Sequence, residues 1–214
     1  WRGRPVDCGN PCRRGILRWL HQGTVEGPPS DGDAGNGALM RNLPAVLATL
    51  GDDEAFRRIS LAQAHVTHHN PVSDAAVLGI GRLLRLQLAG ADLPAMAEAI
   101  GTWVGREPIF RFNPYPGRAS GYVVDTVQTV LHAFVGQPDF EAAVLLAVNR
   151  GDDADTTGAL VGMLAGARCG ARALPRRWMA RLQRSVVQAV TDQASALVAL
   201  ALQRQPISEA TVHA

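Results

Sequence analysis

A run of small and acidic residues, 149–170, constrains the fold of this chain more than any other segment. It reads Asn-Arg-Gly-Asp-Asp-Ala-Asp-Thr-Thr-Gly-Ala-Leu-Val-Gly-Met-Leu-Ala-Gly-Ala-Arg-Cys-Gly. Three carboxylates and two threonine hydroxyls fall within Asp152–Thr157, where a helix of small apolar residues begins. A helix N-terminus favours one or two acids, but three so close together repel one another unless a cation or solvent separates them. These hard oxygen donors suit Mg²⁺, Mn²⁺ or Ca²⁺.

The rest of the chain reads as helix and loop in turn, without strand alternation. Its 214 residues are 47% hydrophobic and 5% aromatic, enough for one large helical core. Asn70 as cap, Pro71 at the first helical position and Asp74 in the first turn mark one helix start clearly. The predicted helices are Arg13–Gln22, Ala38–Leu50, Glu54–Thr67, Ala75–Ala89, Leu93–Val104, Tyr122–Val135, Phe140–Val148, the helix after the acidic cluster, and Pro175–Leu202.

Glycines recur every fourth residue in the helix after the acidic cluster, at Gly158, Gly162, Gly166 and Gly170. This spacing predicts a smooth ridge against which another helix packs. We expect a single domain over residues 1–203 and a flexible tail over 204–214. Because the chain starts with Trp1 rather than methionine, we expect it to be N-terminally incomplete.

Charge and composition exclude several classes. The net charge is +2, there is no lysine, and the arginines are scattered, so no nucleic-acid-binding stripe is present. Three cysteines are too few for a disulfide framework; Cys8 and Cys12, four residues apart, are interpreted as buried free thiols rather than a metal pair. No signal peptide and no uninterrupted apolar run of about 20 residues is visible. A cytoplasmic, monomeric protein is expected.

Two segments near the N-terminus carry polar groups beside glycine. Asp7 and Asn10 flank Gly9, an arrangement that fits a helix cap as well as a functional pair. Residues 35–41, Gly-Asn-Gly-Ala-Leu-Met-Arg, offer unhindered backbone N–H groups at a helix start, a cradle for an anion. The same Gly-Asn-Gly sequence is also typical of a simple turn.

Two further polar segments precede predicted helices. Thr67-His68-His69-Asn70, together with His65, suggests zinc, but no further Cys or His stands at the expected spacing, which argues against it. Ser120 and Tyr122 end a long loop, where ligand binding and helix capping fit equally well.

In combination these segments resemble the ADP-ribosylglycohydrolase family, and within it the bacterial dinitrogenase reductase-activating branch. Residues 153–158 match the family signature Asp-x-Asp-Thr-x-Gly, and residues 35–41 match its Gly-Asn-Gly-x-x-Met-Arg segment. Residues 67–71 match its Thr-His segment, while residues 6–10 and 120–127 look like the nitrogenase-regulating branch. The resemblance covers nearly the whole chain in consistent order.

The resemblance implies an all-α helical bundle with a two-metal cleft holding Mn²⁺ or Mg²⁺. It implies hydrolysis of the N-glycosidic bond between ADP-ribose and an arginine side chain, with the nitrogenase iron protein as target and a PII-type protein as possible regulator. The implied roles fall on three groups of residues. The metal ligands are Asp153, Asp155 and Thr156; the ADP-ribose site is Asn36, Gly37, Ala38, His68 and Tyr122; and the catalytic pair facing the ribose–guanidinium junction is Asp7 and Asn10.

Two departures from the family pattern stand out. Gly151-Asp152 replaces a glycine pair, which places a carboxylate where the backbone turns tightly. The N-terminal Thr-Asp-Asp motif, which carries the other half of the metal cage in the family, does not occur in this sequence. The alternative functions are therefore an inactive ADP-ribose-binding relative and a structural helical domain.

Overall fold

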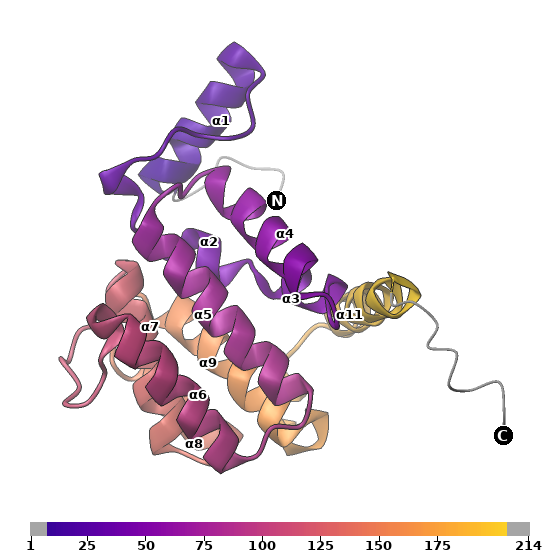
Figure 1. Cartoon of the computed structure of the whole chain (residues 1–214). Coiled ribbons are helices and arrows are strands. Elements are labelled where there is room, and N and C mark those ends of the chain that lie inside the picture. The colour runs from indigo at the N-terminus through magenta and orange to yellow at the C-terminus, as the bar shows by residue number, and fades with distance from the viewer. Residues whose placement is uncertain (1–7, 205–214) are drawn as a thin grey trace, which may run out of the picture.

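The computed structural model describes residues 8–204, and the described chain is helical without a strand (Figure 1). This confirms the predicted all-α class. The α-helices are α1 Asn10–Gln22, α2 Gly37–Met40, α3 Leu43–Ala48, α4 Asp53–His65, α5 Pro71–Leu88, α6 Leu93–Arg106, α7 Val123–Gly136, α8 Phe140–Val148, α9 Ala154–Cys169, α10 Arg176–Met179 and α11 Arg184–Arg204. Three short 3₁₀ helices are η1 Asp31–Asp33, η2 Pro108–Phe110 and η3 Ala171–Ala173.

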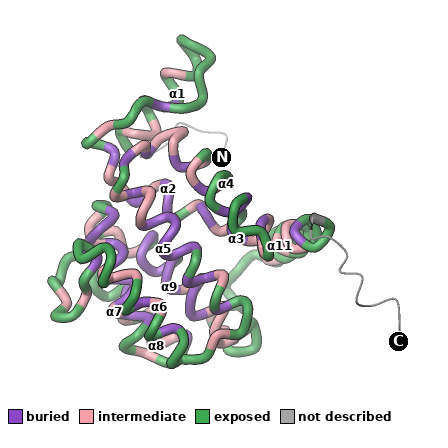
Figure 2. Tube along the Cα trace, viewed as in Figure 1, coloured by how far each residue is buried: buried purple, intermediate pink, exposed green. Residues whose placement is uncertain are grey.

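The core lies where α5, α7 and α9 pack against one another. Figure 2 shows α5 and α9 largely buried, with the outer helices exposed along their solvent faces. Asn70 begins α5 as predicted: its side-chain oxygen accepts from the backbone N–H groups of Val72 and Ser73, at 2.9 and 3.4 Å. Helices α5 and α6 pack closely because Gly79 of α5 has no side chain: a Cβ there would lie 2.0 Å from Trp103 of α6.

The predicted glycine ridge of α9 is only partly correct. A Cβ at Gly158 would lie 2.7 Å from Val148 of α8, so close packing does depend on that glycine. At Gly162 nothing lies within 4 Å, and Gly170 has a φ of +74° and ends the helix. The four-residue spacing therefore marks one close contact and one helix stop, rather than a continuous ridge.

Two predicted helices are each split in two. Ala38–Leu50 breaks between α2 and α3, because Pro44 has no N–H with which to continue the helical hydrogen bonds. Pro175–Leu202 breaks between α10 and α11, over residues 180–183. Trp178 packs edge-on against Phe140 of α8, while α11 packs against α3, so the chain must turn between these two contacts.

Helices α1 and α11 extend from the body of the molecule (Figure 1). Among the described residues, only Arg184–Gln203 is long and apolar enough by composition to cross a membrane, with a mean hydropathy of 1.4. Gln188 and Asp192 lie within this segment, so it is not an uninterrupted apolar run. The predicted tail lies almost wholly outside the described residues.

Candidate functional site

The glycine-rich segment before α2 lies beside the start of α7. The backbone N–H of Asn36 donates to the carbonyl of Gly121 at 3.0 Å, and that of Val123 donates to Ala34 at 2.9 Å. These bonds form an isolated antiparallel bridge between Gly35 and Tyr122. Two loops that are far apart in the sequence are thereby fixed side by side.

The side chain of Asn36 connects these loops to the acidic cluster. It is buried, and its Nδ2 donates to the Oγ1 of Thr126 at 2.8 Å and also to the Oδ2 of Asp153. The backbone N–H of Asp153 in turn donates to the carbonyl of Ala119 at 3.0 Å. The sequence-predicted cradle and the sequence-predicted acids are therefore parts of one site.

Asp153 stands at the N-cap of α9, but its side chain makes no capping hydrogen bond. The turn that precedes it is left-handed at two successive residues, with φ of +76° at Gly151 and +53° at Asp152. This turn directs the Asp153 carboxylate toward Asn36 and Asp155 instead of toward the backbone of its own helix. The carboxylate is thus held at the start of α9 by groups from other segments.

Asp152 occupies the conformation that glycine adopts most easily. We expect Asp152→Ala to lower the free energy of unfolding by about 1 kcal/mol relative to Asp152→Gly, because alanine in the left-handed region is strained and glycine is not. Urea unfolding of the two variants side by side checks this prediction. Equal stability of the two, or a more stable alanine variant, would contradict it.

Asp155 and Thr156 complete the cluster in the first turn of α9. A hydrogen bond with Asp153 and one from the backbone N–H of Thr156 hold the pKa of the exposed Asp155 carboxyl below its ordinary value. Among the described residues, the Oγ1 of the buried Thr156 has only the sulfur of Met40 as a partner, at 3.8 Å. An ionised carboxylate, a second carboxylate beside it and a weakly partnered hydroxyl form a donor set that fits a hard divalent cation.

His68 lies beneath the glycine-rich segment. It is 4% exposed, and a Cβ at Gly37 would lie 2.7 Å from its Cε1. Its Nδ1 is 2.7 Å from the Oγ1 of Thr67, a hydroxyl that accepts from Arg41 at 2.8 Å. The Thr67 hydroxyl can donate its proton to Nδ1 or accept one from it, so this contact fits either tautomer of the imidazole.

Burial, and then the positive charge of Arg41, lower the pKa of His68 from 6.5 to about 4. Asp33 acts in the opposite direction, and Arg14, which pairs with Asp33, again lowers the pKa. His68 is therefore neutral at physiological pH.

Comparison with known proteins identifies the family of this chain. The sequence profile of the ADP-ribosylglycohydrolase family matches residues 1–207. The chain belongs to the ADP-ribosylglycohydrolase family. This confirms the resemblance that the loop motifs indicated.

Individual relatives agree with the family match. The chain is 48% identical over 200 residues to an ADP-ribosyl-[dinitrogen reductase] glycohydrolase of Rhodospirillum rubrum, covering 94% of this chain and 68% of that protein. It is 33% identical over 188 residues to the ADP-ribosylarginine hydrolase Tri1 of Pseudomonas putida, covering 84% of this chain and 51% of that relative. A solved ADP-ribosylglycohydrolase-related protein complex superimposes with a TM-score of 0.80 at 33% identity, covering 90% of this chain and 69% of that one.

Within this ADP-ribosylglycohydrolase chain, the predicted site residues differ in where they lie. Asn36, Gly37, His68 and Asp153 are joined by the contacts described above, and Tyr122, which forms the bridge with Gly35, is 43% exposed. Ala38 is fully buried, backbone included, and packs in the core, and its carbonyl accepts from the Nε2 of Gln63 at 3.1 Å.

Of the predicted catalytic pair, only Asn10 lies among the described residues, and no contact joins it to this cluster. Asn10 is exposed at the start of α1, and among the described residues it makes no side-chain hydrogen bond. Asp7 lies outside the described residues. Cys8 is exposed and Cys12 is half-buried, so the interpretation of both as buried thiols is wrong for Cys8, which precedes the helix.

Sequence reasoning missed the residues that connect the site. Thr126 bridges the side chain of Asn36 and the carbonyl of Ser120, and Arg41 reaches both Gln63 and Thr67. Both lie inside the segments that carried the family resemblance, but their polar partners come from distant segments. A sequence pattern gives no signal for such partners.

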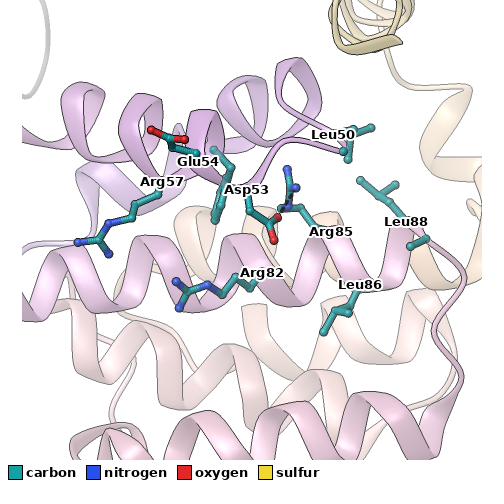
Figure 3. A pocket seen from close by; sticks show the side chains of 11 residues that line it. Leu50, Asp53, Glu54, Arg57, Arg82, Arg85, Leu86 and Leu88 are labelled. Atoms are coloured by element: carbon teal, nitrogen blue, oxygen red, sulfur yellow. Dashed lines mark hydrogen bonds and ion pairs between the residues drawn. The ribbon is translucent and has the colours of Figure 1, made fainter. Parts of the chain in front are cut away.

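A cavity of about 890 Å³ lies away from this site, between α4 and α5 (Figure 3). None of the predicted site residues lines it. Arg85 in its wall is already engaged, because its guanidinium donates to Asp53 and to the carbonyl of Thr49, each at 2.6 Å. The candidate site is therefore assigned from the Asn36–Asp153 contacts and not from the size of a cavity.

Proposed function

We propose that this chain hydrolyses the N-glycosidic bond between ADP-ribose and an arginine side chain. The hydrogen bond between Asn36 and Asp153 carries the proposal, because it joins an anion-binding loop to a carboxylate cluster that suits a divalent cation. The names of the relatives, a dinitrogen reductase glycohydrolase and an ADP-ribosylarginine hydrolase, support the same reaction.

Different residues of this chain would bind or support different parts of the ADP-ribose site. The backbone N–H groups at the start of α2, in Gly37 and Ala38, have no partner within their helix and would bind the diphosphate. That of the half-buried Gly37 is the more accessible of the two. Tyr122, exposed beside Gly35, offers an aromatic surface to the ADP-ribose. His68 holds the glycine-rich loop in shape from below, since its ring is packed against the backbone of Gly35 and Gly37.

Asp153, Asp155 and Thr156 would hold the divalent cation, Mn²⁺ or Mg²⁺. Such an ion supplies charge stabilisation and orients oxygen ligands while the ribose acquires oxocarbenium character. Asn36 keeps the Asp153 carboxylate in place for this task. Asp7 and Asn10 remain proposed as the groups near the ribose–guanidinium junction, where the leaving guanidine needs a proton.

The target is proposed to be dinitrogen reductase, the protein that the name of the Rhodospirillum rubrum relative specifies. The alternative is a relative that binds ADP-ribose equally well but does not release it from arginine.

One assay separates these two functions. A protein ADP-ribosylated on arginine is incubated with Mn²⁺ and either the 214-residue chain or the longest reading frame that contains it, and released ADP-ribose is quantified by chromatography. We expect release from the arginine conjugate and none from a conjugate through glutamate. Binding of free ADP-ribose by calorimetry, without release by either protein, would contradict hydrolysis and favour the binding function.

A further inference from the structure

A second group of metal-ligating side chains lies apart from the acidic cluster. The loop that follows α1 crosses the end of α4 and brings Glu26 against His65 and His69. The Oε1 of Glu26 is 3.4 Å from the Nδ1 of His65 and 4.0 Å from the Nδ1 of His69. One ligand atom from each residue lies within 4.8 Å of the others.

We propose that Glu26, His65 and His69 form a Zn²⁺ site. Two imidazoles and a carboxylate are the ligands of many three-residue zinc sites, with water in the fourth position. Bonds of about 2.0–2.1 Å in a tetrahedral site place neighbouring ligand atoms about 3.4 Å apart. The Glu26–His65 separation of 3.4 Å already matches this value, whereas the Nδ1 of His69, 4.0 Å from Glu26, must move closer. The sequence argued against zinc because the third ligand comes from a separate loop rather than from a regularly spaced Cys or His.

The surroundings of His65 match those of a zinc-bound imidazole. With Nδ1 toward Glu26, its Nε2 lies 3.0 Å from the Oδ2 of Asp74 in the first turn of α5. A carboxylate that accepts the second N–H of a metal-bound histidine fixes its tautomer and raises its basicity. The other oxygen of Asp74 is buried without a hydrogen-bond partner, so this carboxylate serves His65 alone.

The loop that carries Glu26 is held in position by backbone hydrogen bonds. The N–H of Gly27 donates to the carbonyl of His65, and that of Ser30 donates to the carbonyl of His69, both at 2.9 Å. Arg18 adds bonds to the carbonyls of Val25 and Val66, at 2.8 and 2.5 Å. The ligands are therefore brought together by the fold itself and need little ordering when an ion binds.

One movement is required for binding. The two imidazole rings are stacked with centroids 3.6 Å apart and planes 13° from parallel. A single ion lies in the plane of both rings only after one of them turns. His69 is the ring that turns, because its side chain is 22% exposed, whereas His65 is tied to Asp74. The turn breaks the hydrogen bond that the Nδ1 of His69 donates to the carbonyl of Gly27 at 2.6 Å, and zinc takes the place of that proton.

The two sites select different ions. The acidic cluster offers only oxygen donors, which suit Mn²⁺ and Mg²⁺, whereas imidazole nitrogens favour Zn²⁺. Zinc at the histidine site would clamp the loop after α1 to the segment that contains His68. This zinc would have a structural role, so its binding does not depend on whether the chain hydrolyses ADP-ribosylarginine.

Zinc binding is measured by competition with a chromophoric chelator, in a chain whose acidic cluster is removed by Asp153→Ala and Asp155→Ala. We expect one equivalent of Zn²⁺ and a rise in Tm on adding it. Glu26→Gln should weaken binding at least tenfold without unfolding the chain, because Glu26 is an exposed loop residue. Asp74→Asn should weaken it about 10–100-fold.

The matched control is His21→Asn, which removes an exposed histidine of α1 that takes no part in the cluster. It should bind zinc as the parent does. Cobalt substituted for zinc should give visible absorption bands typical of tetrahedral coordination, and these bands should be lost in His69→Asn. Two outcomes would overturn the proposal. One is that the parent binds less than one equivalent of Zn²⁺; the other is that both single variants, Glu26→Gln and His69→Asn, bind it as tightly as the parent.

Discussion

Replacing Asp153 by alanine is expected to lower kcat/KM for release of arginine-linked ADP-ribose by about a thousandfold or more. The change removes a carboxylate of the proposed cation site and one of the two hydrogen bonds that the buried amide of Asn36 donates to described side chains, leaving that to Thr126. A bound cation supplies several kcal/mol of charge stabilisation, and about 1.4 kcal/mol corresponds to a factor of ten in rate. The rate is measured with the arginine conjugate over a range of Mn²⁺ concentrations.

Two variants test whether the loss arises at the cation. Asp155→Ala should cause a loss of similar size, whereas Asp152→Gly, which restores the glycine pair of the family, should keep activity near that of the parent. The Asp153→Ala protein should retain its helical circular dichroism. Activity within tenfold of the parent at low Mn²⁺ would rule out the assigned role of Asp153.

Local signals in the sequence predict most helix boundaries correctly. Asn70 followed by Pro71 begins α5, and Gly23, with a φ of +67°, ends α1, because capping depends on a few adjacent residues. The breaks at residues 41–42 and 180–183 were not predicted. The second of these has no glycine or proline, and it results from the separate packing of Trp178 and α11.

The sequence predicted individual residues of the candidate site but not the contacts between them. The motifs identified Asn36, His68 and Asp153, whereas the hydrogen bond between Asn36 and Asp153 spans residues that only the folded chain brings together. The same limit explains Glu26, whose approach to His65 depends on how the loop after α1 crosses α4. Spacing along a chain predicts ligands that share one element, and it misses those contributed by a second one.

The second large effect expected is a loss of stability in acid that depends on His68. Its pKa is lowered from 6.5 to about 4 in the folded chain. Between these values the unfolded chain binds the proton that the folded chain excludes, so the free energy of unfolding falls as pH drops from about 6.5 through 4. At about 1.4 kcal/mol for each unit of pKa, the full loss attributable to this residue is about 3 kcal/mol.

Urea unfolding at a series of pH values measures this loss, and His68→Gln isolates it. Glutamine keeps a polar side chain beneath the glycine-rich loop but does not titrate, so the variant should lose less stability than the parent between pH 6.5 and 4. His21→Gln is the control, because this exposed histidine of α1 should leave the parent's pH dependence unchanged. The comparison must be a difference between proteins, because the other titratable groups then contribute equally to both.

The outcome also decides how His68 serves the site. If burial and the charge of Arg41 exclude the proton from His68, the loss in the parent should exceed that in His68→Gln by about 3 kcal/mol at pH 4. Identical pH dependence in the two proteins would show that the imidazole binds a proton as readily in the folded chain as in the unfolded chain. His68 would then gain a positive charge beneath Gly35 and Gly37 below about pH 6.5, and this charge would add attraction for the diphosphate to the support of the loop.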